Sequence, residues 1–221
     1  MKYPPEFTAF REKLESFGVT LTEESLELIL PLVHKKQFKK GQVILKPGEI
    51  CTEIYYIIKG MIRSYYKLPN GTEKTFILCK EHNLFGEHSS FISQKPSLDY
   101  VEAIEDTEIY YVSYEGLTSL YDGYKEWSIL GRKISDVNFE VSKRRMRSLM
   151  NDDAMTRYAL YLKTYKSVLH RVPQHIVASY LGITPQSLSR LKREFGESMS
   201  SPTASLSPSN SLNKSQEHSP K

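Results

Sequence analysis

The sequence predicts an α+β protein, and three observations support this fold class. Short runs rich in β-branched and aromatic residues occupy residues 38–112 and are separated by turn signals. A proline-free stretch over residues 124–150 is typical of a long helix, and two short helices joined by a glycine are indicated over 173–195. Strands are therefore expected in the first half of the chain, with helices on both sides of them.

The first segment, residues 4–34, is predicted to be helical. Thr22 is a good N-cap residue, acidic residues follow it, and Leu26 and Ile29 lie at helical spacing.

The strand-like segment predicts an antiparallel sandwich or barrel, because short strands at regular spacing are punctuated by Gly, Pro and Asn-Gly. The sharpest hairpin signal is Asn70-Gly71, which stands between two of these runs. The predicted strands are Gln42–Leu45, Ile54–Ile58, Ile62–Lys67, Lys74–Cys79, Tyr100–Ala103 and Glu108–Val112.

The long helix over residues 124–150 has two alternative explanations. A single helix of this length cannot bury its apolar stripe in a small domain, which favours pairing with a second copy of the chain. Alternatively, it packs against its own β domain. Its apolar positions are imperfectly periodic: Ile129, Ile134, Val137, Phe139, Val141, Met146, Leu149 and Met150.

The segment PQHIVASYLGITPQSLSRLKREF, residues 173–195, predicts a helix-turn-helix. Pro173 opens the first helix, and Gly182 supplies the left-handed residue that a tight turn needs. Thr184 then caps the second helix, with Pro185 at its first position. The inward positions are Ile176, Val177, Leu181, Ile183, Leu188, Leu191 and Phe195.

The outer face of the second helix has a composition that suits the major groove of DNA. Gln can make paired hydrogen bonds to adenine and Arg to guanine, while Ser, Thr and Lys suit phosphates. The alternative is an ordinary helical hairpin with a polar face. The candidate DNA-binding residues are Thr184, Gln186, Ser187, Ser189, Arg190, Lys192 and Arg193.

Charge is distributed unevenly along the 221 residues, whose formal net charge is +4. Residues 1–124 contain 14 Lys/Arg and 18 Asp/Glu, a net charge of −4, whereas residues 125–196 contain 14 and 6, a net charge of +8. This asymmetry indicates a nucleic-acid-binding half joined to a different one. The last 25 residues are neutral and rich in serine, so we expect residues 197–221 to be disordered.

Composition also excludes several classes. Two cysteines, Cys51 and Cys79, are too few for a disulfide framework or an iron–sulfur cluster. No run of about 18 apolar residues is present, so no membrane span is expected, and the first residues lack the pattern of a secretory signal. We therefore expect a reduced, cytoplasmic protein without a metal or other cofactor.

Residues 10–196 resemble the Crp–Fnr family of bacterial transcription regulators. The resemblance is carried by FKKGQVILKPGEICTEIYYIIKGMIRSYY, by NLFGEHSSF and by ASYLGITPQSLSRLKRE. It implies a cyclic-nucleotide-binding-type β-roll (a jelly-roll-like double-stranded β-helix) in residues 1–122 and a dimerisation helix in 123–151. It also implies a winged-helix-like DNA-binding domain in 152–196, although the Ser-rich tail stands where many members carry a wing.

The resemblance further implies a homodimer bound to a palindromic site on double-stranded DNA. Further partners implied by it are a small-molecule effector and RNA polymerase. Two recognition helices of such a dimer would lie about 34–36 Å apart in successive major grooves.

The segment Asn83–Glu87 resembles the start of the family's phosphate-binding cassette, and the implied pocket residues are Phe85, Gly86, Glu87, Lys95 and Ser97. Members that bind cyclic AMP hold its phosphate with an Arg about ten residues further on, but this chain has no Arg between Arg63 and Arg132. Since a buried phosphate needs a charged partner, the sequence argues against ordinary cyclic AMP binding. Three alternatives stay open: another ligand, a vestigial pocket, or weak binding through Lys95.

Two functions from other classes compete with a DNA-binding regulator. A cupin-like metal enzyme would need clustered ligands, and only His82, Glu87 and His88 lie near one another in the sequence. A ligand-binding module that acts on a protein partner is the second alternative. The basic charge of residues 125–196 favours DNA over both, and we expect no enzymatic activity.

Overall fold

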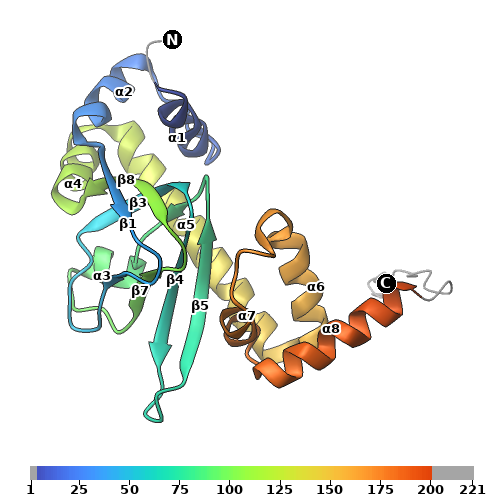
Figure 1. Cartoon of the computed structure of the whole chain (residues 1–221). Helices are drawn as coiled ribbons and strands as arrows, with labels where there is room; N and C mark the ends of the chain where they lie inside the picture. The colour runs from blue at the N-terminus through green and yellow to red at the C-terminus, as the bar shows by residue number, and fades with distance from the viewer. Residues whose placement is uncertain (1–3, 201–221) are drawn as a thin grey trace, which may run out of the picture.

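The computed structural model describes residues 4–200, which form an N-terminal β-sandwich, a long helix and a group of C-terminal helices (Figure 1). The sandwich consists of two four-stranded antiparallel sheets, with strand orders β1-β8-β3-β6 and β2-β7-β4-β5. The strands are β1 His34–Phe38, β2 Val43–Leu45, β3 Glu53–Lys59, β4 Met61–Lys67, β5 Glu73–Lys80, β6 Leu84–Phe85, β7 Tyr100–Ala103 and β8 Thr107–Ser113.

Helices precede, interrupt and follow the sandwich. In Figure 1, α1 and α2 lie at one end of it, and α7 lies beside β5 with α6 and α8 beyond it. The α-helices are α1 Pro5–Glu15, α2 Glu23–Ile29, α3 His88–Ser93, α4 Tyr114–Gly123, α5 Lys125–Asn151, α6 Ala154–Thr164, α7 Gln174–Leu181 and α8 Pro185–Ser200. Two short 3₁₀ helices, η1 Leu30–Leu32 and η2 Lys166–Val168, complete the set.

The predicted α+β class and each of the six predicted strands are confirmed, and Thr22 caps α2 by accepting a hydrogen bond from the Ser25 N–H. Asn70-Gly71 lies in the β4–β5 hairpin, where Gly71 has a φ of 81°. The sequence analysis missed β1, β6 and α3. Four of the five residues of β1 are exposed and β6 has only two residues, so neither carries an alternating pattern.

Gly60 forms the tight corner between β3 and β4. Its φ is 97°, and a Cβ at this position would lie 2.4 Å from Thr107 Oγ1 and 2.7 Å from the Asp106 carbonyl oxygen. Only glycine fits this backbone conformation beside another strand.

The first half of helix α5 follows one of the two explanations that its sequence left open, packing against its own β domain, while pairing with a second copy stays a prediction. Its first half packs on the sandwich core through Trp127 and Leu130, each 1% exposed. Its second half instead carries three large side chains at a spacing of seven and four residues, and all are exposed: Phe139 (66%), Met146 (54%) and Met150 (75%). We call these three residues the α5 stripe.

The boundary expected for the C-terminal tail was wrong by four residues, since α8 continues past 196 and ends at Ser200. Gly196 does not end the helix, because an isolated glycine is tolerated there at a modest cost. Residues 201–221, most of the expected disordered tail, lie outside the described residues. Within residues 4–200 no strand follows β8, so no wing accompanies the helix pair there.

Candidate DNA interface and candidate ligand cavity

Helices α7 and α8 form the predicted helix-turn-helix. Gly182 ends α7 in the left-handed conformation, with a φ of 72°, and the Ile183 N–H donates to the Ala178 carbonyl oxygen over 3.0 Å. Thr184 Oγ1 accepts a hydrogen bond from the Ser187 N–H at 3.1 Å, and Pro185 is the first residue of α8. The turn is therefore built by the residues that the sequence indicated.

The inward face of α8 packs into the C-terminal core. Leu188 is 1% exposed and Leu191 is 7% exposed. The Phe195 ring is half-buried and meets the Tyr158 ring edge-on, with centroids 5.4 Å apart. This packing fixes which face of α8 points to solvent.

The candidate DNA-binding residues are all exposed except Lys192, which is half-buried. Thr184 and Ser187 hydrogen-bond to each other at the start of α8, Ser189 donates to the Pro185 carbonyl oxygen, and Lys192 donates to Gln174 Oε1. Among residues 4–196, whose side chains the structure describes, none binds those of the three remaining candidates, so their donors and acceptors are available to a ligand: Gln186, Arg190 and Arg193.

Two arginines that the sequence analysis did not single out hold the end of α7. Arg157 Nε of α6 donates to the Leu181 carbonyl oxygen at 2.9 Å. Arg145 of α5 donates to the Tyr180 carbonyl oxygen, and its guanidinium carbon lies 3.9 Å from the centroid of the Tyr180 ring. Burial lowers the pKa of Arg145. These cations satisfy carbonyl groups that the end of a helix leaves unpaired, and they tie α5 and α6 to the turn before α8.

A cavity of about 1210 Å³ lies between the sandwich, α5 and α6. Most of its wall is apolar, and the apolar residues that line it include Phe85, Phe91, Leu117 and Trp127. A concave, mainly apolar cavity with a few polar groups is the usual form of a small-molecule site.

Three of the five predicted pocket residues line this cavity: Phe85, Gly86 and Glu87. The Glu87 carboxylate caps α3 by accepting from the Ser89 and Ser90 N–H groups. Lys95 and Ser97 do not line it. Lys95 is exposed, and Ser97 is buried in its own turn, where its hydroxyl group bonds to the Asp99 backbone.

Asp99 and Ser64 are cavity residues that the sequence analysis missed. Ser64 Oγ donates to Asp99 Oδ2 at 3.1 Å, and burial raises the pKa of this carboxyl group. Burial lowers the pKa of His88, another residue of the wall. Asp99 could not be found from sequence, because it follows no motif and meets Ser64 only through the pairing of β4 with β7.

Few cations face the cavity. Arg63 is 3% exposed but does not line it, since its guanidinium binds Glu73 and Glu102, each at 2.6 Å. Lys80 and Arg132 do line it. Lys80 Nζ is engaged by the Thr164 carbonyl oxygen at 3.0 Å, which leaves the exposed Arg132 of α5 as the cation without a partner among the described wall residues.

Within residues 4–200 no group of three or more His, Cys, Asp or Glu side chains is placed to hold a metal ion. In the same part of the chain, no helix combines the length and apolar character needed to cross a membrane.

Comparison with known proteins relates both parts of the molecule to regulators. Residues 35–124 match the family "Cyclic nucleotide-binding domain". The "Cyclic AMP receptor protein" of Thermus thermophilus is 23% identical over 182 residues, which cover 80% of this chain and 83% of the relative. The "Fumarate and nitrate reduction regulatory protein" of Vibrio cholerae is 23% identical over 191 residues, covering 81% and 76%.

Among solved structures, FixK2 from Bradyrhizobium japonicum has the same fold. The TM-score is 0.67 at 20% sequence identity, and the match covers 76% of this chain and 86% of FixK2. The two proteins thus share one fold over the matched part of the chain. Together with the two related regulators, this shared fold shows that the chain is similar to Crp–Fnr regulators in sequence and in fold.

Proposed function

We propose that the protein is a homodimeric transcription regulator that binds double-stranded DNA in a sequence-specific way. The observation that carries this proposal is the exposed face of α8, where Gln186, Arg190 and Arg193 are left without partners by the described residues. The side chains that read base edges in the major groove are of these types. The net charge of +8 over residues 125–196 supports the same conclusion, because phosphate neutralisation supplies much of DNA affinity.

The α5 stripe supports a dimer. Large apolar side chains that are this exposed on one helix face are typical of an interface with another copy. A two-fold axis along α5 would present two α8 helices to successive major grooves, so we propose a palindromic site. We assign residues 1–122 to the sensor domain, 123–151 to dimerisation and 152–196 to DNA binding.

The cavity is proposed to hold an effector other than cyclic AMP. Asp99 and Glu87 both face it, and Arg63 is committed to two glutamates. Lys80, the sandwich cation in the described wall, is already engaged by the Thr164 carbonyl oxygen. A buried phosphate next to carboxylates, without a free cation of the β-sandwich to pair with, is unfavourable. Isothermal titration of the purified protein with cyclic AMP tests this; binding in the micromolar range would overturn it.

Selection of duplexes from a random pool with the full chain tests the DNA-binding function itself. We expect enrichment of an inverted repeat with half-sites about 10–10.5 base pairs apart, centre to centre, or a multiple of this. Footprinting on genomic DNA then identifies the natural sites. Failure to enrich any motif, together with the absence of salt-dependent binding, would contradict the proposal.

A further inference from the structure

Strand β5 is both an edge strand and a wall of the cavity. It is the last strand in the order β2-β7-β4-β5, so one edge of it has no neighbouring strand among the described residues. The C-terminal helices occupy this edge, with α7 beside β5 in Figure 1.

Ser179 of α7 takes the place of a neighbouring strand at this edge. The Thr75 N–H donates to Ser179 Oγ at 2.8 Å, and Ser179 Oγ donates to the Glu73 carbonyl oxygen, also at 2.8 Å. One hydroxyl group therefore satisfies a donor and an acceptor of the β5 backbone, as a paired strand would. Because α7 packs directly against α8, this contact fixes the recognition helix relative to β5.

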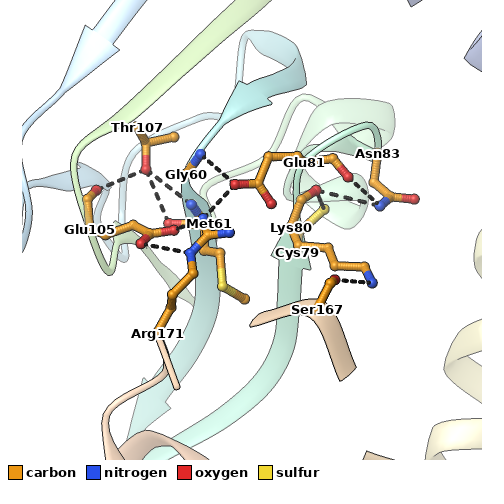
Figure 2. A network of polar contacts seen from close by, with 10 residues as sticks. All are labelled: Gly60, Met61, Cys79, Lys80, Glu81, Asn83, Glu105, Thr107, Ser167 and Arg171. Atoms are coloured by element: carbon orange, nitrogen blue, oxygen red, sulfur yellow. Dashed lines mark hydrogen bonds and ion pairs between the residues drawn. The ribbon is translucent and has the colours of Figure 1, made fainter. Parts of the chain in front are cut away.

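The end of α6 is attached to the same strand. Tyr165 donates its hydroxyl hydrogen to the Leu78 carbonyl oxygen at 2.8 Å. Lys80 Nζ donates to the Thr164 carbonyl oxygen at 3.0 Å and to Ser167 Oγ at 3.4 Å, and Figure 2 shows the second of these contacts.

An ion-pair group lies next to these contacts, beyond the end of β5. Arg171, in the segment between η2 and α7, binds the carboxylates of Glu81 and Glu105, and Glu81 also accepts from the Gly60 N–H (Figure 2). Burial raises the pKa of Glu81, but the hydrogen bonds from Arg171 and the backbone outweigh it and lower the pKa overall. This group adds an electrostatic contact between the sandwich and the C-terminal helices.

The same residues border the cavity. Leu78 and Lys80 of β5 line it, and so do Thr164 and Tyr165, which those two residues bind. An occupant seated at this side of the cavity would therefore lie against both partners of these contacts. A ligand shifts a conformational equilibrium when it interacts differently with the two states, and contacts at such a junction allow this.

We propose that β5 transmits the state of the cavity to the recognition helix, and that Ser179, Tyr165 and Lys80 are the positioning residues. This inference rests on the proposed function for its biological meaning, but its structural content does not depend on DNA. It adds a second route beside α5, which joins the sandwich to the turn before α8 through Arg145.

The test measures distances between the sandwich and α8 in the full chain without DNA. Spin labels are placed by Thr52→Cys and Glu194→Cys, both at exposed positions, while the native Cys51 and Cys79 are buried. Labelled protein is diluted into unlabelled protein, so that distances within one chain dominate, and the distribution is measured by double electron–electron resonance.

Ser179→Ala and Lys80→Ala are expected to broaden the distribution. Ser179→Thr keeps the hydroxyl group and should restore the narrow distribution. Lys74→Ala, a change in the same strand at a residue outside the cavity wall and without an ion pair among the described residues, is the matched control. Thermal unfolding of each variant verifies that the chain is folded.

A second arm changes the cavity. Ile77→Phe enlarges a β5 side chain that lines the wall, and we expect it to shift the mean distance in the otherwise unaltered chain. The shift should shrink when Ser179→Ala and Lys80→Ala are added. A narrow distribution in the Ser179→Ala, Lys80→Ala protein, or an undiminished shift, would overturn the inference. Failure of the duplex selection would instead overturn the DNA-binding function and leave these distances unaffected.

Discussion

The Ser64 hydroxyl group donates a hydrogen bond to Asp99 Oδ2 over 3.1 Å in the wall of the cavity. Burial raises the pKa of Asp99 above its ordinary value of 3.8, and the bond from Ser64 offsets part of this effect. An acid with a raised pKa in the folded state stabilises folding at low pH, and this contribution is lost as the pH rises through the folded-state value. At neutral pH the charged carboxylate is therefore destabilising.

We accordingly expect Asp99→Asn to raise the free energy of unfolding at pH 7, measured by urea denaturation. The gain should shrink as the pH falls through the folded-state value and disappear well below pH 3.8, where the carboxyl group is protonated in both states. Asp106→Asn is the contrasting control. The Lys40 N–H and the Lys39 side chain lower the pKa of Asp106, so its contribution is present above pH 3.8 and this variant should lose stability at pH 7. Equal effects of both variants would contradict the opposite directions assigned to the pKa shifts of Asp99 and Asp106.

Gly60→Ala should be much more destabilising than Gly71→Ala. Both residues have a positive φ, 97° and 81°, and the left-handed backbone costs an alanine about 1–2 kcal/mol in either case. Only Gly60 has neighbours that a Cβ would strike, Thr107 Oγ1 and the Asp106 carbonyl oxygen, whereas nothing lies within 4 Å at Gly71. We expect a loss above about 4 kcal/mol for Gly60→Ala in urea unfolding. Similar losses of unfolding free energy in the two variants would show that the backbone around residue 60 moves to accommodate the Cβ.

Arg190→Ala should weaken specific DNA binding by about 1–3 kcal/mol and relax the preference at one base pair, because a bidentate contact to guanine would be lost. Arg193→Ala should lower affinity evenly across sequences and reduce the salt slope by about 1. Fluorescence anisotropy with the selected duplex and its single-base variants, at several salt concentrations, measures both. Lys74→Ala, far along the chain from α8, is the control for a lost positive charge. An unchanged base preference in Arg190→Ala would remove this residue from the set that reads bases.

Phe139→Glu combined with Met146→Glu should convert the dimer to a monomer in sedimentation velocity. Two carboxylates in the α5 stripe would be buried without partners in a dimer, which is strongly unfavourable. Glu140 is an exposed residue of α5 that lies between Phe139 and Met146 in the sequence. Glu140→Gln is the control and should leave the dimer intact. A dimer that survives the double substitution would show that another face of α5 forms the interface.

Features encoded by neighbouring residues could be predicted from the sequence. Gly182, Thr184 and Pro185 specify the helix-turn-helix locally, and Asn70-Gly71 specifies the β4–β5 hairpin. The contacts that join distant segments could not be predicted. Ser179 meets Thr75 across 104 positions, and nothing in either segment indicates the partner.

The candidate sites also comprise one part that the sequence predicts and one part that it does not. The exposed face of α8 follows from helical periodicity, but the cavity wall depends on which strands pair. Weak phosphate binding through Lys95 was one of the alternatives that the sequence left open, yet the side chain of Lys95 is exposed and lies outside the wall. Asp99 reaches the wall instead and places a carboxyl group there.

Helix α5 is long enough to turn a small tilt at one end into a large displacement at the other. Its 27 residues extend about 40 Å, since each residue of an α-helix adds 1.5 Å. A tilt of about 5° at the end packed on the sandwich would displace the far end by about 3.5 Å over this length. That distance is close to the rise of one base pair, about 3.4 Å. In the proposed dimer, a tilt of a few degrees at the end of α5 that holds Trp127 and Leu130 would therefore change the register of the two α8 helices on a duplex by a full step.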